Sequence, residues 1–277
     1  CNSILATYTA LSLADWVVTE AGFGADLGAE KFLDTKCRIA GIRPDCVVIV
    51  ATVKALKLHG GADKASLSEE NLPALRAGMP NLYKHIENIR NVYNLPVVVA
   101  MNRFASDTPA EIETVMRGVE EAGAKAVFTD VFLKGGEGGR ELAEAVCAAA
   151  EERGMRYAYD LNDPVEKKIE DVVRKVYGGA GVTFSAVAEE KIADAEKRGY
   201  GKLPVIIAKT QYSLSDDAKL LARPEGFTVH VRDVIVKGGA GFIVAVAGNI
   251  MLMPGLGKVP AAEHIDVDEN GEIVGLS

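Results

Sequence analysis

Cysteine is scarce in this chain. Only four of the 277 residues are cysteine, at positions 1, 37, 46 and 147. This spacing offers neither the ligand pairs of a zinc site nor the dense framework of a small disulfide-stapled domain. We therefore expect no metal site, and we expect Cys37 and Cys46 to be reduced and buried.

Long apolar runs and an excess of basic residues are also absent. No run reaches the roughly 18 apolar residues that span a bilayer, and no signal-peptide pattern occurs, so we expect a cytoplasmic protein without membrane contacts. The formal net charge is −8, with 31 Lys and Arg against 39 Asp and Glu, which argues against a nucleic acid partner. A hydrophobic content of 48% over 277 residues allows a sizeable core and two domains.

An initiator methionine and a Walker A motif are missing as well. The chain begins at Cys1 and runs directly into the helix-like pattern "NSILATYTALSLA". One interpretation is a truncated or incomplete sequence. The other is a processed chain with Cys1 as the nucleophile of an amidohydrolase, which is disfavoured because such enzymes begin with a strand. No G-x-x-x-x-G-K-[ST] sequence occurs, so a dedicated triphosphate cradle is not present.

The sequence does contain a regular alternation of helix and strand patterns. The apolar runs "DCVVIVAT", "LPVVVAMN" and "AKAVFTDVF" are typical of buried parallel strands. We therefore predict an α/β fold of mainly parallel sheets with flanking helices. A further strand is expected at 16–19, and "FTVHVRDVIVKGGAGFIVAVAG" predicts two strands joined by a glycine-rich turn. Helices are expected at 3–14, 28–38, 52–58, 69–92, 108–123 and 140–153, the last ended by Gly154, and "DENGE" predicts a hairpin turn.

Gly22, Gly24 and Gly28 form a glycine-rich loop between an expected strand and a helix. Backbone without Cβ atoms can approach a ligand closely, and that ligand is often a phosphate. The spacing is near that of a dinucleotide fingerprint, but the next strand ends in "VVIVATV", without the acid that would hold a ribose. Asp45 stands at the other end of that strand, so a nicotinamide cofactor is disfavoured.

Three further loops follow the carboxyl ends of expected parallel strands, where ligands bind in such sheets. One places Phe104 between Arg103 and Asp107, which suggests a stacking platform or a core phenylalanine. Another combines Lys134 with four glycines, as an anion-binding nest or a tight connection. The remaining loop carries basic residues that are ligand contacts or a solvated helix end, namely Lys54, Lys57, His59 and Lys64.

The polar stretch "AKTQYSLSDD" also follows an expected buried strand directly. It places Lys209, Gln211 and Tyr212 at the end of that strand. A second unusual stretch, "MPGLGKVPAAE", lies near the end of the chain. Both are unusual for linkers and are further candidates for a site.

Long motifs of this chain resemble formate–tetrahydrofolate ligase, also called formyltetrahydrofolate synthetase. They include "ADWVVTEAGFGADLGAEKF", "ATVKALKLHGG", "NLPALRAGMPNLYKHIENI", "NRFASDT", "KGGEGG", "LPVIIAKTQYSLSDD" and "GFIVAVAGNIMLMPGLGKVPAAEHIDVDENGEIVGL". The resemblance covers essentially all 277 residues. It implies the reaction of ATP, formate and tetrahydrofolate to 10-formyltetrahydrofolate, ADP and phosphate, by way of formyl phosphate.

The resemblance also implies roles for the loops. The glycine-rich loop would offer backbone N–H groups to formyl phosphate, with Phe23 lining the pocket. Asp26 is a candidate polar contact without an assigned proton-transfer role. The candidate catalytic residues are Gly22, Phe23, Gly24 and Asp26.

The folate ring system is expected between two aromatic side chains, Phe104 and Phe132. Many relatives have Trp at the second position, so Phe132 keeps a stacking face but loses the indole area and N–H. Lys134 and the following glycines would support the same pocket. The candidate folate-binding residues are Phe104, Phe132, Lys134, Gly135 and Gly136.

Domain organisation follows from the same resemblance. Residues 1–84 would complete an otherwise missing P-loop-NTPase-like nucleotide domain, 85–250 would form a second α/β domain, and 251–277 a small third piece. The resemblance implies Mg²⁺-ATP, an activating K⁺ or NH₄⁺ ion and a homotetramer. It implies that the P-loop lies in an N-terminal half that this chain would need as a partner.

Two other functions remain open beside a ligase half. One is a non-catalytic folate-binding module derived from the ligase. The other is the amidohydrolase that would use Cys1. Finding a neighbouring polypeptide with a P-loop would favour the ligase half, and failing to find one would favour the binding module.

Overall fold

Helices and strands alternate along most of the chain, as the sequence predicts. The computed structural model describes residues 3–151, 154–248, 250 and 258–275. Up to residue 151 the elements are α1 (Ile4–Leu13), α2 (Gly28–Lys31), η1 (Phe32–Cys37), α3 (Arg38–Ala40), β1 (Val47–Ala51), α4 (Val53–His59), η2 (Lys64–Ser66), α5 (Leu72–Glu87), η3 (Asn88–Val92), β2 (Val97–Asn102), α6 (Pro109–Glu121), β3 (Lys125–Thr129), α7 (Val131–Lys134), η4 (Gly135–Gly139) and α8 (Arg140–Ala149). From residue 154 they are α9 (Val165–Val172), η5 (Val173–Tyr177), β4 (Gly181–Phe184), α10 (Ala186–Lys197), η6 (Tyr200–Lys202), β5 (Val205–Ala208), β6 (Thr228–Lys237), β7 (Phe242–Ala247), η7 (Ala261–Glu263), β8 (Asp266–Val267) and β9 (Ile273–Val274).

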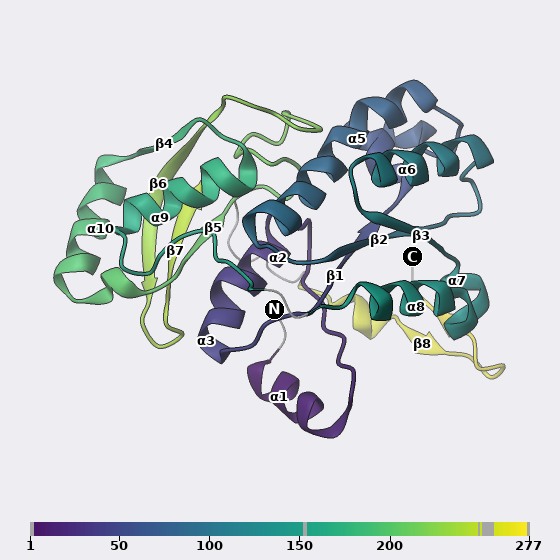
Figure 1. Ribbon diagram of the computed structural model, residues 1–277, viewed down its shortest axis with the longest axis horizontal. Helices are drawn as coiled ribbons and strands as arrows, with labels where there is room; N and C mark the ends of the chain where they lie inside the picture. Colours follow the sequence, from purple (N-terminus) through teal and green to yellow (C-terminus); the bar gives the residue numbers. More distant parts are fainter. Residues whose placement is uncertain (1–2, 152–153, 249, 251–257, 276–277) are drawn as a thin grey trace.

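Three parallel strands form the first sheet, in the order β1-β2-β3. Helices α5 and α6 lie on one side of it and α8 on the other (Figure 1). The central strand β2 is buried from Val97 to Met101, whereas β1 at the edge buries only alternate residues. The continuous apolar run that predicted β2 therefore reflects cover on both faces. Because the strands are parallel, their carboxyl ends share one edge of the sheet.

Two glycines set how closely α4 and α5 approach each other. A Cβ atom on Gly78 would lie 1.8 Å from the carbonyl oxygen of Leu56, and one on Gly60 would lie 1.7 Å from that of Ala74. No side chain fits at either position, so the two helices pack backbone against backbone. Helix α5 begins after Asn71, whose side chain accepts a hydrogen bond from the N–H of Ala74.

The second sheet is mixed, in the order β4-β6-β7-β5. Strand β4 pairs parallel with β6, β5 pairs parallel with β7, and β6 and β7 form the predicted antiparallel hairpin. Helices α9 and α10 accompany this sheet in the other half of the molecule (Figure 1). Buried side chains of both sheets, such as Val99 and Ala245, belong to one apolar cluster.

Strands β8 and β9 form a small antiparallel hairpin near the end of the chain. The "DENGE" segment connects them, and the N–H of Asp268 donates to the carbonyl oxygen of Glu272 over 2.8 Å, which confirms the predicted turn. Among the described helices, none has both the length and the apolar character that crossing a bilayer requires.

One predicted strand and the predicted ends of two other elements are wrong. Residues 16–19 form no strand, because no described strand pairs with them and an isolated strand leaves its backbone groups without partners. Strand β3 ends at Thr129, and the residues from Val131 form α7. Helix α8 ends at Ala149 rather than near Gly154, since Ala150 already has an extended backbone.

The domain border expected at residue 84 does not separate the two sheets. It falls inside α5, and β1 before it pairs with β2 after it. The first sheet therefore draws strands from both sides of that position. The sheets divide the described chain between α8 and α9, and residue 250 lies between β7 and the terminal hairpin.

The close approach of α4 and α5 leads to a first prediction. Replacing Gly78 by Ala should lower the free energy of unfolding by about 2 kcal/mol or more, since the methyl group must push two backbones apart. Urea denaturation measures the change. The control is Gly239→Ala, where a Cβ meets nothing within 4 Å, and which should change stability by less than about 1 kcal/mol. Equal losses in the two variants would contradict this account of Gly78.

Candidate functional site

The glycine-rich loop folds back on the start of α2. The N–H groups of Leu27 and Gly28 donate to the carbonyl oxygen of Gly24 over 3.0 and 2.8 Å. A Cβ atom on Gly28 would lie 1.9 Å from the carbonyl oxygen of Gly22, so only glycine permits this fold. Gly22 itself borders open space, with nothing within 4 Å of a Cβ built on it. One of the three glycines thus shapes the loop, and another leaves its backbone accessible.

Phe23 at the tip of this loop has a strained backbone and an exposed ring. Its φ is 62°, which is uncommon for a residue with a bulky side chain. The side chain is 80% exposed. Strain of this kind persists only where the surroundings impose it, and it gathers at binding sites. Phe23 is therefore a candidate ligand contact on structural grounds as well.

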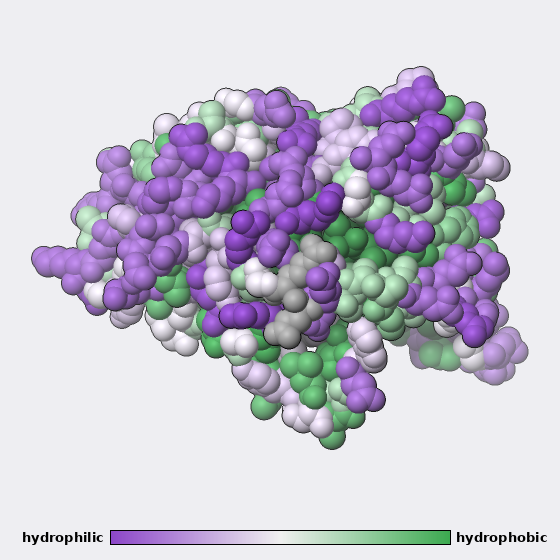
Figure 2. Space-filling model, in the orientation of Figure 1, coloured by the Kyte–Doolittle hydropathy of each residue, from purple (hydrophilic) through white to green (hydrophobic). Residues whose placement is uncertain are grey.

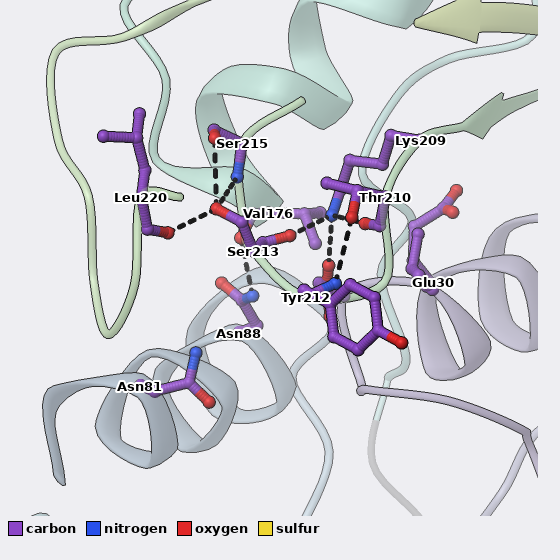
Figure 3. A network of polar contacts seen from close by, with 12 residues as sticks. Glu30, Asn81, Asn88, Val176, Lys209, Thr210, Tyr212, Ser213, Ser215 and Leu220 are labelled. Atoms are coloured by element: carbon purple, nitrogen blue, oxygen red, sulfur yellow. Dashed lines mark hydrogen bonds and ion pairs between the residues drawn. The ribbon is translucent and has the colours of Figure 1, made fainter. Parts of the chain in front are cut away.

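Asp26 of the same loop forms a buried ion pair with Lys209. The Lys209 Nζ lies 2.7 Å from the Asp26 Oδ2, and both side chains are buried. Lys209 directly follows β5, so the pair connects the glycine-rich loop to the carboxyl end of a strand in the second sheet. The same ammonium group donates to the carbonyl oxygens of Thr210 and Ser213 (Figure 3). Burial lowers the pKa of Lys209, and Asp26 acts in the opposite direction.

More carboxyl groups are buried on the helix that follows the loop. Glu30 is fully buried, its Oε2 accepts from Lys31 over 3.4 Å, and its Oε1 has no partner among the described residues. Burial raises the pKa of Glu30 to about 8 and that of Asp34 to about 6. Asp34 is held by the backbone N–H of Ala158 at 2.8 Å and the hydroxyl of Tyr93 at 2.9 Å. Asp34 thus lies where η1 meets segments near residues 93 and 158.

Three π-helical turns, η1, η3 and η5, contribute residues to this buried region. Asp34 lies on η1, Asn88 begins η3, and Val176 lies on η5. The Asn88 side chain donates to the carbonyl oxygen of Val176 over 2.7 Å and joins two of the turns directly. Extra residues of this kind inside helices recur at functional sites. His85, one turn before η3, is buried, with its Nδ1 unpartnered among the described groups and its pKa lowered by burial.

The carboxyl edge of the first sheet carries the first of two exposed aromatic side chains. Phe104 follows β2 and is 41% exposed, and the Lys54 Nζ lies 4.8 Å from the centre of its ring. The backbone N–H of Phe104 donates to the Asp107 Oδ2 over 2.8 Å, which fixes the turn that presents the ring. Burial raises the pKa of Asp107.

Phe132 lies on α7, immediately after the neighbouring strand β3, and is 91% exposed. Lys134, on the same short helix, forms a 3.5 Å ion pair with Asp130. Gly135 and Gly136 border open space, with nothing within 4 Å of a Cβ on either. The structure therefore places Phe104, Phe132 and the glycine segment after adjacent parallel strands, on the same edge of the sheet.

Two of the basic residues that follow β1, Lys57 and His59 on α4, have structural partners. Lys57 is buried and pairs with Glu111 at 2.8 Å, and its Nζ also donates to the carbonyl oxygen of Glu69. The His59 Nδ1 accepts the N–H of Ala222 at 3.3 Å. Lys57 is therefore a buried structural residue rather than a solvated helix end, and the Nδ1 of His59 is occupied by the backbone. Cys1 lies outside the described residues. No three His, Cys, Asp or Glu side chains in the described ranges are grouped as metal ligands would be.

Comparison with known proteins identifies the family. The model of the family described as formate–tetrahydrofolate ligase matches residues 1–277. This chain belongs to the formate–tetrahydrofolate ligase family. It is 55% identical over 281 aligned positions to a formate–tetrahydrofolate ligase of Psychrobacter sp. (strain PRwf-1), a match that covers 100% of this chain and 49% of that relative. The chain thus spans about half the length of the relative that it matches.

In this ligase-family chain the sequence indicated Asp26 and Lys209 separately but not as a pair. They are 183 positions apart, and nothing in local spacing joins them. Glu30 and Asp34 were not singled out, because acids four residues apart on a helix are typical of a solvated face. No signal in the sequence alone distinguishes their burial from exposure.

The Asp26–Lys209 pair leads to a second prediction. Lys209→Met removes the cation and leaves the Asp26 carboxylate buried, which should lower the free energy of unfolding by about 3–5 kcal/mol. The matched control is Lys191→Met, whose pair with Asp233 is partly exposed and should contribute about 1 kcal/mol or less. Chemical denaturation at neutral pH compares the two. The assignment fails if the two lysine variants lose the same stability.

The buried Glu30 leads to a third prediction. Its pKa rises from 4.5 in an unfolded chain to about 8 on folding, so the folded state holds the proton and loses stability as pH rises toward 8. Relative to a Glu30→Gln variant, the wild-type free energy of unfolding should fall by about 2 kcal/mol between pH 6 and pH 8. Lys168, whose pKa burial lowers to about 8, acts oppositely in this range but is common to both proteins. Parallel pH profiles would contradict the buried, protonated state of Glu30.

Proposed function

We propose that this chain supplies the tetrahydrofolate site and part of the formyl-phosphate site of an ATP-dependent formate–tetrahydrofolate ligase. The observation that carries the proposal is the pair of exposed aromatic side chains, Phe104 and Phe132, after neighbouring parallel strands. A folate is a planar heteroaromatic molecule, and planar ligands stack on such rings. Exposed phenylalanines have no structural need to stand at this edge, where α/β proteins bind ligands.

The glycine-rich loop would handle the acyl phosphate. Gly22 and Gly24 would present backbone N–H groups to the phosphate oxygens, where charge develops as the formyl group is transferred. Phe23 would cover one side of this pocket and limit access of water to a reactive anhydride. Asp26, held by Lys209, would keep the loop in place, and we assign it a positioning role.

Lys134 with Gly135 and Gly136 would support the folate side of the same pocket. The Lys134 side chain is 63% exposed and its partner Asp130 is nearly buried, so the ammonium group remains accessible to an anionic ligand. Glycines that border open space allow a ring or a carboxylate to approach the backbone. These residues would orient the folate rather than take part in bond making.

ATP and Mg²⁺ would bind to the other half of the ligase. No Walker A sequence occurs in this chain. We propose that a polypeptide equivalent to the N-terminal half of the relatives supplies the P-loop, and that the complete enzyme is a cytoplasmic homotetramer activated by K⁺ or NH₄⁺. The family resemblance supports these assignments.

Formation of 10-formyltetrahydrofolate tests the proposal. The chain is assayed with ATP, formate and tetrahydrofolate, alone and together with the N-terminal part of the Psychrobacter ligase. We expect product only in the presence of both polypeptides. Folate binding without turnover in the mixture would favour a non-catalytic folate-binding module. No folate binding under either condition would overturn the proposal.

Phe132 gives a fourth prediction, measured in the complemented mixture. Phe132→Ala should raise the KM for tetrahydrofolate about tenfold, since stacking on an aromatic face contributes about 1 kcal/mol beyond its buried area. Phe132→Trp should lower KM because the indole is larger. The control is Leu133→Ala, a neighbouring exposed residue of α7, which should leave KM unchanged. A tenfold rise in the control would show that α7 is merely perturbed.

A further inference from the structure

Exposed apolar side chains concentrate near the start of the chain. Of the 23 large apolar side chains that are exposed in the described part of the chain, ten lie within the first 50 residues. They occupy helix α1, the irregular segment 14–19, the glycine-rich loop, helix α3 and strand β1. Scattered exposed apolar residues are normal, but a concentration of this kind marks an interaction surface.

Helix α1 has the composition of a buried helix and the environment of an exposed one. Its sequence ILATYTALSL carries apolar residues around the whole circumference, yet Thr7 is its only buried residue. Leu5 is 76% exposed and Leu13 is 80% exposed. A helix that is apolar all round is normally enclosed by other elements. Figures 1 and 2 show α1 projecting at the lower end of the molecule with apolar side chains on its surface.

Two hydrogen bonds connect α1 to the residues of η1 and α3. The Lys36 Nζ donates to the Thr7 Oγ1 over 2.9 Å, and the Tyr8 hydroxyl donates to the carbonyl oxygen of Ala40. Both contacts fix the position of the helix. Neither removes its leucines from water, so the apolar surface remains for another protein to cover.

The segment that follows α1 is an unpaired strand by its sequence. "DWVVT" has strand-forming residues, but no described strand lies beside it. Trp16 is 58% exposed and Val18 is 92% exposed. Large β-branched and aromatic side chains of this kind are stable where a neighbouring strand or helix packs on them. Their exposure again points to a missing neighbour.

Strand β1 forms an unprotected edge of the first sheet as far as the described strands extend. Among the described strands it pairs only with β2, and Val48 and Val50 on one of its faces are 37% and 66% exposed. Its sequence VVIVA carries none of the charges or prolines that protect a natural edge from pairing. Parallel sheets are covered on both faces in complete domains. Helix α8 packs mainly on β2 and β3, and on β1 Val48 and Val50 remain exposed.

We propose that α1, residues 16–18 and the open face of β1 form the docking surface for the other half of the ligase polypeptide. The relative that matches this chain has about half its length outside the match, which is a partner large enough to cover three elements. The partner would add apolar side chains over α1 and Trp16, and secondary structure beside β1. The inference rests on the proposed function and names the surface through which the two halves meet.

Substitutions on the open face test the proposal. The full chain is co-expressed with the affinity-tagged N-terminal part of the Psychrobacter ligase, and the amount that co-purifies is measured. Val50→Lys and Leu13→Glu should each lower co-purification at least tenfold, since a charge would be buried against an apolar partner. The matched control is Val187→Lys on α10, 53% exposed and part of the second sheet's layer, which should leave recovery unchanged.

The possible outcomes separate this inference from the proposed function. Thermal unfolding of each purified variant checks that it folds, and we expect melting temperatures near that of the wild type because the changed positions are exposed. Equal recovery with Val50→Lys and the wild type, while the mixture makes 10-formyltetrahydrofolate, overturns the docking surface and leaves the function standing. Tenfold loss with Val50→Lys and no turnover by the wild-type mixture supports the surface and overturns the function. A chain that self-associates through Val50 and recovers no partner overturns the docking proposal in favour of contact between copies.

Discussion

The ion pair between Asp26 and Lys209 is the contact on which the arrangement of the site depends. Two opposite charges are removed from water at 2.7 Å, and such a pair is tolerated only when further hydrogen bonds complete it. The carbonyl oxygens of Thr210 and Ser213 meet this requirement for the lysine. Because the two partners come from different halves of the chain, the glycine-rich loop is positioned only when the second sheet has formed.

Close backbone contacts also connect the glycine-rich loop to helix α2. Gly28 allows the carbonyl of Gly22 to approach, so the loop and α2 form one unit. The unit continues through the π-helical turn with Asp34, which Tyr93 and the backbone of Ala158 hold from two other segments. A change in any of these contacts would therefore reach the loop.

Sequence reasoning predicted the elements whose information is local. The run that became β2 is apolar because both faces of that strand are covered, and composition records this directly. The run that became β1 is equally apolar, although one face of the strand is exposed. Residues 16–19 have the same composition but form no strand, since pairing depends on a neighbour that local sequence does not encode. The partner of Lys209 was unpredictable for a related reason: an ion pair across 183 positions leaves no periodic signal. Glu30 was missed because helical spacing is the same for a buried acid and a solvated one.

The candidate site contains groups that contacts within this chain hold in place and groups that are exposed to solvent. The groups that position the loop are buried and satisfied within this chain, whereas Phe23, Phe104 and Phe132 stand exposed with apolar area uncovered. Covering an exposed aromatic ring is favourable by about 25 cal/mol for each Å² of apolar surface, so an occupant that stacks on these rings gains this free energy. For Phe104 and Phe132 a planar ligand is a sufficient occupant. For α1 and β1 it is not, because a helix that is apolar all round and an unpaired strand require the side chains and backbone of another polypeptide.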